Sequence, residues 1–182
     1  MTMIDSATRV HSDRLVLLPV SDEYKLEICH EFTAEVTRYM PFNPTGDIKM
    51  TEAFLEDARQ EMQTGEGVHF CILNKETNEF LGVCGIHNMN TRGIEIGLWI
   101  KISRQASGFG TETVGALLDF VRLNLSFDYV SYPVDKDNLA SRKIPEKFGF
   151  IPFKTYEKNK SREEVLHIIE YRRANETAVK IP

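Results

Sequence analysis

The chain has 182 residues and a formal net charge of -5 at pH 7, and 42% of its residues are hydrophobic while 27% are charged. This length and composition are typical of one soluble domain, so we expect a single domain over residues 1–182 with a core from about 12 to 174. The acidic balance, without a basic stripe, excludes nucleic acid as a partner and favours a cationic substrate. Short apolar stretches and the lack of a signal pattern predict a cytoplasmic protein without a membrane partner.

The first part of the chain predicts a strand followed by two helices. Residues 14–20 are apolar and β-prone, which predicts a strand, and Ser21-Asp22-Glu23 offers a capped start for a helix that runs to about Phe32. Two prolines and a glycine within residues 40–46 predict a loop. A second amphipathic helix is expected from Thr51.

From Val68 onward the spacing of apolar residues becomes that of strands. Three runs separated by short turns predict an antiparallel meander over residues 68–74, 80–89 and 94–100. An apolar stripe at helical spacing then predicts a helix over 111–125. The remaining predicted elements are a strand over 129–134, a helix over 138–148, and strands over 150–156 and 164–172. No linker or repeat interrupts them, which indicates one mixed α/β domain.

A glycine-rich turn joins the third meander strand to the striped helix. Gly108 and Gly110 lie where this helix begins, and glycine lets the backbone approach an anion without a Cβ in the way. The first helical turn also leaves N–H groups unpaired at the positive end of the helix dipole, which suits a pyrophosphate. Such a turn alone is equally consistent with a plain tight turn. A P-loop is excluded because no Lys-Ser/Thr follows, and a Rossmann turn because the preceding strand belongs to a meander.

Several motifs, in order, resemble those of GNAT acetyltransferases. Gln105-x-x-Gly108-x-Gly110, followed by Thr111-Glu112, resembles the family's Arg/Gln-x-x-Gly-x-Gly/Ala signature. Residues 94–99 resemble its fourth strand, while 138–141 and 146–150 resemble its Asn-x-x-Ser and Glu-Lys-x-Gly-Phe helix. Residues 38–42 and 75–77 extend the likeness toward the RimJ and RimL branch of protein N-terminal acetyltransferases. The resemblance spans roughly residues 14 to 153.

This resemblance implies a GNAT fold of the α/β (α+β) class. The implied fold has a mixed, mostly antiparallel sheet of about seven strands, flanked by helices and splayed between the family's fourth and fifth strands. Acetyl-CoA is the implied cosubstrate, with its pantetheine arm in the splay and a backbone N–H near Trp99 and Ile100 holding the developing oxyanion. The implied cofactor-binding residues are Trp99, Ile100, Gln105, Ala106, Ser107, Gly108, Phe109, Gly110, Thr111 and Asn138.

Two side chains are candidates for the proton transfers. Glu95 alternates with Ile94 and Ile96, so its carboxylate lies on the opposite face of the strand. It can serve as the general base for the amine and attract a protonated acceptor, although a strand glutamate is often a plain surface group. Many family members carry a tyrosine acid where this chain has Pro145. Ser141 is therefore the remaining candidate acid for the leaving thiolate, whose thiol has a pKa of about 8.5.

The sequence gives fewer indications of the residues that bind the acceptor. The loop that carries Tyr39 and Phe42 resembles the segment that covers the acceptor site in this branch. His69, His87 and His167 lie in separate strands without ligand spacing, so no metal is expected.

The predicted function is transfer of an acetyl group from acetyl-CoA to a primary amine. The acceptor is either a protein N-terminal α-amine or a small-molecule amine. The alternative is a non-catalytic acyl-CoA-binding GNAT-like domain, which Pro145 would suit. Dimers are common in the family, so a homodimer is an open expectation.

Overall fold

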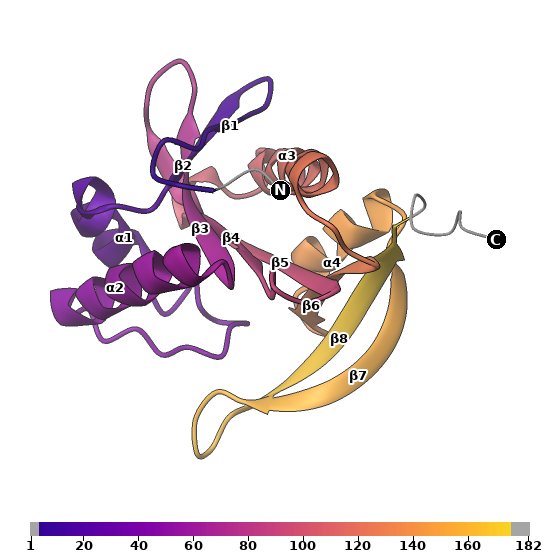
Figure 1. The fold of residues 1–182 in the computed structure, drawn as a ribbon. Helices are drawn as coiled ribbons and strands as arrows, with labels where there is room; N and C mark the ends of the chain where they lie inside the picture. The colour runs from indigo at the N-terminus through magenta and orange to yellow at the C-terminus, as the bar shows by residue number, and fades with distance from the viewer. Residues whose placement is uncertain (1–3, 176–182) are drawn as a thin grey trace.

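The computed structural model describes residues 4–175, and within them eight strands form one sheet in the order β1-β2-β3-β4-β5-β6-β8-β7 (Figure 1). The strands are β1 (Val10–His11), β2 (Leu15–Pro19), β3 (Gly67–Asn74), β4 (Phe80–His87), β5 (Gly93–Ile100), β6 (Tyr129–Asp135), β7 (Ile151–Asn159) and β8 (Val165–Ala174). The helices are η1 (Asp22–Tyr24), α1 (Lys25–Glu31), α2 (Ile48–Thr64), η2 (Ile102–Arg104), α3 (Phe109–Asn124) and α4 (Leu139–Lys147).

The expected mixed, mostly antiparallel sheet is confirmed, but it has eight strands rather than about seven. The additional strand is β1, whose two residues pair with β2 at the edge of the sheet. A two-residue strand is too short to produce an alternating apolar pattern, so the sequence carries no signal for it. Every neighbouring pair is antiparallel except β5 and β6, which run parallel.

Local chemistry sets the ends of the two long helices. The Asp47 side chain accepts a hydrogen bond from the N–H of Lys49, so α2 begins at Ile48 rather than at the expected Thr51. Gly65 ends this helix in the left-handed conformation, with φ of 73°. Gly108 precedes α3 with φ of 82°, and α3 consequently starts at Phe109, within the glycine-rich turn itself.

Two apolar clusters cover the two faces of the sheet. One packs α3 against the inward residues of the central strands, including Ile94 and Ile96 of β5. The other packs α1 and α2 against the opposite face, where Trp99 of β5 lies (Figure 1). Since side chains alternate along a strand, Glu95 shares the α1–α2 face with Trp99. Among residues 4–175, no helix is long and apolar enough to cross a membrane.

Candidate active site

The two parallel strands at the centre of the sheet separate after a short paired stretch. β5 and β6 pair only over Gly93–Glu95 and Tyr129–Ser131. Ser131 Oγ closes this stretch by donating a hydrogen bond to the Ile94 carbonyl at 3.2 Å. Beyond it, β5 continues alongside β4 and β6 continues alongside β8. The splay expected between the family's fourth and fifth strands is therefore the gap between β5 and β6.

One side of β5 presents backbone groups to this gap. The Lys101 N–H donates to the Leu81 carbonyl on β4 at 2.8 Å. Because backbone groups alternate sides along a strand, the N–H groups of Leu98 and Ile100 point away from β4, toward the gap. The Ile100 carbonyl points the same way and accepts a hydrogen bond from Gln105 Nε2 at 2.9 Å.

The backbone N–H groups of Trp99 and Ile100, both predicted to bind acetyl-CoA, therefore point to opposite sides of β5. By the same alternation the Trp99 N–H faces β4. The Trp99 indole packs 5.5 Å from the Phe32 ring and 5.9 Å from the Phe80 ring, measured between centroids. Ile100 is thus the member of the pair whose N–H faces the gap.

The glycine-rich turn leaves a row of backbone donors free. The first helical hydrogen bond of α3 runs from the Glu112 N–H to the Gly108 carbonyl at 3.1 Å. Within residues 4–175, the N–H groups of Ser107 through Thr111 donate to no protein acceptor. Ala106 has φ of 58°, a left-handed conformation that bends the chain into this row. Several free donors at a helix N-terminus form an anion-binding site of the kind that a pyrophosphate needs.

A partly exposed ion pair, between Arg14 and Glu112, holds this turn in place. Arg14 Nε donates to Glu112 Oε2, and both the Arg14 N–H and Ser12 Oγ donate to Glu112 Oε1, each at 2.7 Å. Burial would raise the pKa of Glu112, but these hydrogen bonds outweigh it and hold the pKa below its usual value. The Arg14 guanidinium also lies 4.5 Å over the Phe109 ring and donates to the Ser107 carbonyl at 3.3 Å.

Arg14 thus places a cation beside the free N–H groups of the turn. This role was not predicted from the sequence, because Arg14 and Glu112 are distant in the chain and meet only when β2 packs beside α3.

The start of α4 carries the predicted acid and a partner that the sequence analysis missed. Asn138 Oδ1 accepts a hydrogen bond from the Ser141 N–H at 3.1 Å and so caps the helix. Ser141 Oγ lies 2.8 Å from the hydroxyl of Tyr132 on β6. Burial raises the pKa of Tyr132 to about 12, although the hydrogen bond with Ser141 lowers it, so this phenol stays protonated. Pro145 is buried near the end of α4.

On the opposite face, Glu95 has an unpaired carboxylate. It is half-buried and, within residues 4–175, forms no hydrogen bond or ion pair through its side chain. His87 lies directly across from it on β4. Burial is the main reason that the pKa of Tyr156 on β7 is raised, and the negative charge of Glu95 raises it further, which places this phenol near Glu95. The carboxylate is therefore open to an incoming cation.

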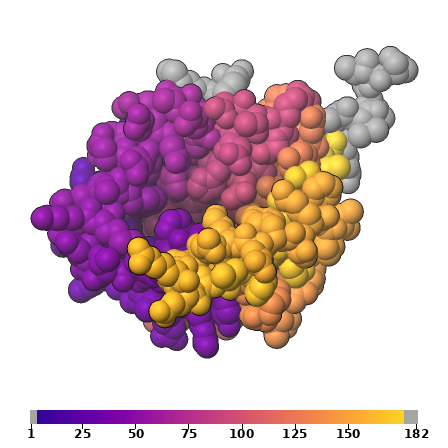
Figure 2. Space-filling view, turned by 90° about the horizontal axis from the view of Figure 1, so that it is seen from below, coloured from indigo at the N-terminus to yellow at the C-terminus, as the bar shows by residue number. Residues whose placement is uncertain are grey.

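The predicted acceptor loop is tied to the β7–β8 hairpin. Asn43 Nδ2 donates to the Lys160 carbonyl at 3.0 Å, and Lys160 Nζ donates to the Arg38 carbonyl at 2.9 Å. Figure 2 shows the orange and yellow hairpin lying against this purple loop, with the surface hollowed beside them. The hairpin was predicted as two strands, but its contact with the loop depends on tertiary structure.

Phe42 and Tyr39, the two loop residues predicted to bind the acceptor, differ in their exposure and in the groups that they contact. Phe42 is 49% exposed, and its ring centroid is 6.2 Å from that of Phe32, which in turn contacts Trp99. Tyr39 is half-buried, with the Arg38 guanidinium 5.7 Å from its ring. An aromatic row therefore leads from the loop to β5, on the same face of the sheet as Glu95.

Comparisons with known proteins agree with this arrangement. The acetyltransferase (GNAT) domain model matches residues 14–151. The uncharacterized N-acetyltransferase p20 of Bacillus licheniformis is 26% identical over 159 residues, covering 84% of this chain and 89% of p20.

Two solved structures share the fold. The ribosomal L7/L12 α-N-protein acetyltransferase RimL, in complex with coenzyme A, matches with a TM-score of 0.79 and 15% identity, covering 92% of this chain and 98% of that one. The microcin C7 self-immunity acetyltransferase MccE, in complex with acetyl-CoA and AMP, matches with a TM-score of 0.79 and 16% identity, covering 90% and 94%. Because the family match extends over most of the chain, this protein belongs to the GNAT family of acetyltransferases.

Proposed function

We propose that the protein transfers an acetyl group from acetyl-CoA to a primary amine, either a protein N-terminal α-amine or a small-molecule amine. The observation that carries this proposal is the position of the β5–β6 gap. The free N–H groups at the start of α3 lie at one end of β5, and the open carboxylate of Glu95 lies where the gap begins. A thioester in this gap would have an anion site for its pyrophosphate and a base for the attacking amine.

The residues of the turn would hold the cosubstrate. The N–H groups of residues 107–111 would donate to the pyrophosphate, with Arg14 adding positive charge beside them. Gln105 would fix the entry to the turn through its bond to the Ile100 carbonyl. The pantetheine arm would then lie along β5, where the N–H groups of Leu98 and Ile100 face the gap.

Three steps of acetyl transfer follow from the side chains around the gap. Glu95 would first attract the ammonium form of the acceptor and then take its proton, which leaves a neutral nitrogen to attack the thioester carbon. An N–H of β5 would hold the oxyanion that forms as the C–N bond is made. When the C–S bond breaks, Ser141 would donate its proton to the thiolate, with its hydroxyl oriented by Tyr132, and would regain a proton from the new amide nitrogen, which carries one more than the amide product keeps.

The surroundings of Glu95 support a primary amine as the acceptor. The loop of residues 38–46 and the β7–β8 hairpin border the face on which Glu95 lies, and the surface is hollowed beside them (Figure 2). RimL is named for an α-N-protein substrate, and MccE was solved with AMP. Both kinds of acceptor therefore belong in the test.

A non-catalytic acyl-CoA-binding domain is the second candidate. It is favoured by Pro145, which supplies no proton at the position where many relatives carry a tyrosine. A domain of this kind would keep the free N–H groups of the turn and bind acetyl-CoA without releasing thiol.

Release of free thiol from acetyl-CoA tests both candidates. The acceptor panel should contain polyamines, amino acids, and peptides that begin with Ser or Ala. We expect one acceptor class to stimulate release, and Glu95→Gln to lower kcat by about 100-fold while the KM for acetyl-CoA stays unchanged. Glu76→Gln, a substitution at an exposed carboxylate in the β3–β4 turn, is the matched control and should behave as wild type. Tight binding of acetyl-CoA without stimulated release by any acceptor would favour the non-catalytic domain.

A further inference from the structure

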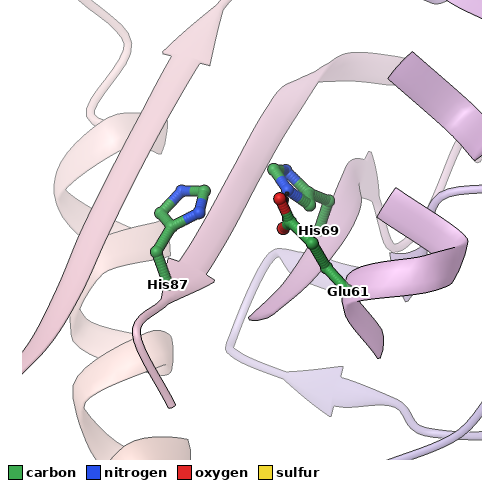
Figure 3. Close-up of side chains that lie close together, drawn as sticks. All are labelled: Glu61, His69 and His87. Carbon is green, nitrogen blue, oxygen red and sulfur yellow. Dashed lines mark hydrogen bonds and ion pairs between the residues drawn. The ribbon is translucent and has the colours of Figure 1, made fainter. Parts of the chain in front are cut away.

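Three potential metal ligands meet on the α1–α2 face, on the β3 and β4 side of Glu95. Glu61 comes from α2, His69 from β3 and His87 from β4, and Figure 3 shows their side chains converging. One ligand atom from each lies within 4.8 Å of the others, and His69 Nε2 is 3.0 Å from Glu61 Oε2. The expectation that no metal binds rested on spacing along the chain, but strand pairing brings the two imidazoles together.

The β3–β4 register explains how they meet. His69 lies opposite Gly85, and Gly67 lies opposite His87, so the two histidines are diagonal neighbours on the same face. The centroids of their rings are 4.9 Å apart. The position of each imidazole is therefore fixed by a central pair of strands.

Two glycines make the room that these side chains occupy. A Cβ on Gly85 would lie 2.8 Å from His87 Nε2 and 3.2 Å from His69 Nδ1. A Cβ on Gly67 would lie 2.8 Å from Glu61 Oε2. Any larger residue at either position would push a ligand atom away, so the backbone itself is shaped around the cluster.

The protonation states suit a metal. Burial lowers the pKa of both His69 and His87, and the proximity of His69 lowers that of His87 further, against the opposing charges of Glu61 and Glu95. Burial thus favours the neutral imidazole in both residues, which is the form that coordinates metals. Two imidazoles and one carboxylate form a ligand set of the type found in zinc sites that keep a fourth position open.

We propose that Glu61, His69 and His87 bind one Zn²⁺ ion, which links α2 to the central strands β3 and β4. Tetrahedral bonds of about 2.0–2.1 Å place ligand atoms roughly 3.4 Å apart. The His69–Glu61 pair is already close to that distance, and the widest separation in the cluster would have to shorten by about 1.4 Å at most, from 4.8 Å. Metal binding would require small adjustments of the side chains to shorten this separation, and a water would complete the coordination.

Calorimetric titration tests the site directly and does not depend on the proposed acetyl transfer. Untagged protein stripped by a chelator is titrated with Zn²⁺ at pH 7.5. We expect one ion per chain, a rise in Tm of roughly 5 °C in excess Zn²⁺, and a loss of affinity of roughly 100-fold in His69→Gln and in His87→Gln. The matched control is His167→Gln, because His167 also lies near a carboxylate, Glu157, at 3.7 Å, but on the exposed hairpin.

Cobalt keeps the proposal testable even if a histidine variant misfolds. Co²⁺ added to the stripped wild-type protein should give the visible absorption of a tetrahedral ion with nitrogen ligands, and Zn²⁺ should remove it. The proposal is overturned if the wild type takes up no stoichiometric Zn²⁺, if folded His69→Gln binds as tightly as the wild type, or if bound Co²⁺ shows only the weak absorption of an octahedral aqueous ion.

Discussion

The two sides of the candidate active site are assembled in different ways. On the acetyl-CoA side, residues 105–111 form one continuous turn that ends in α3, and its donors are backbone N–H groups. On the acceptor side, Glu95 comes from β5, Phe42 from a loop, and Tyr156 from the β7–β8 hairpin. A backbone site survives most changes of side chain, whereas the acceptor side depends on every segment that contributes to it. We therefore expect substrate specificity to depend mainly on the acceptor side.

The two sides also differ in charge. The turn is flanked by the Arg14 guanidinium and by the N-terminus of α3, both of which favour an anion. The acceptor side presents the unpaired carboxylate of Glu95, which favours a cation. Substitutions on each side should consequently change the kinetics of one substrate and spare the other.

An effect as large as that of Glu95→Gln is expected at Ser141, which we propose lies beside the thioester. Ser141→Ala should lower kcat by about 100-fold and leave the KM for acetyl-CoA unchanged, because the thiolate would leave without a proton donor. Tyr132→Phe should lower kcat by about tenfold, since the serine remains but loses its orienting partner. Steady-state thiol release measures both, with exposed Ser126→Ala as the control. Wild-type kcat in Ser141→Ala would assign the acid to another group.

A substitution in the turn should affect the acetyl-CoA side alone. Gly108→Ala adds a Cβ at φ of 82° beside the free N–H groups, so we expect the KM for acetyl-CoA to rise about tenfold and the KM for the acceptor to stay constant. Gly65→Ala imposes similar strain, at φ of 73°, in open space at the end of α2. If both variants raise the KM equally, the effect is one of stability and the turn holds no pyrophosphate.

Breaking the contact between the loop and the hairpin should affect the acceptor side alone. Asn43→Ala removes the hydrogen bond to the Lys160 carbonyl, so the loop loses one of its two anchors. We expect the KM for the acceptor to rise about threefold, which corresponds to a hydrogen bond of about 0.5–1 kcal/mol, while the KM for acetyl-CoA is unchanged. An equal rise for both substrates would contradict the separation of the two sides. Exposed Asn90→Ala, in the β4–β5 connection, is a suitable control.

The smallest effect concerns the strain in the turn itself. Ala106 adopts φ of 58°, which costs an alanine about 1 kcal/mol relative to glycine. Ala106→Gly should raise the free energy of unfolding by about 0.5–1 kcal/mol, measured by urea denaturation. Ala53→Gly, in the middle of α2, should lower it by about 0.5–1 kcal/mol. A loss of stability in Ala106→Gly would show that the alanine methyl group contributes packing that outweighs the strain.

Most of the fold was predictable from local patterns. Seven of the eight strands lie where the alternation of apolar residues predicted them, because each is long enough for its buried face to appear in the sequence. β1 was missed because its two residues are too few to show an alternating pattern. The start of α2 was predicted too late because its N-cap, Asp47, precedes the apolar stripe. The turn around Gly108 was predictable because glycine at the start of a helix has a direct backbone consequence.

The partners of the site residues were not predictable in the same way. Tyr132 reads as one more apolar strand residue until α4 places Ser141 against its hydroxyl. His69 and His87 read as isolated strand residues until the β3–β4 register makes them neighbours. Each of these contacts depends on strand register or on packing between distant segments. The local sequence of one segment does not show which other segment it contacts.

By itself, the sequence determined the order of the elements, the conformation of the glycine-rich turn and the face of β5 on which Glu95 lies. These features depend on backbone conformation and on side-chain alternation, which neighbouring residues control. Only the tertiary structure decided that Arg14 anchors the turn, that Tyr132 orients Ser141, and that the hairpin closes against the loop of residues 38–46. Those contacts form because burial of the two apolar clusters fixes how distant segments meet, and local sequence does not encode the meeting points.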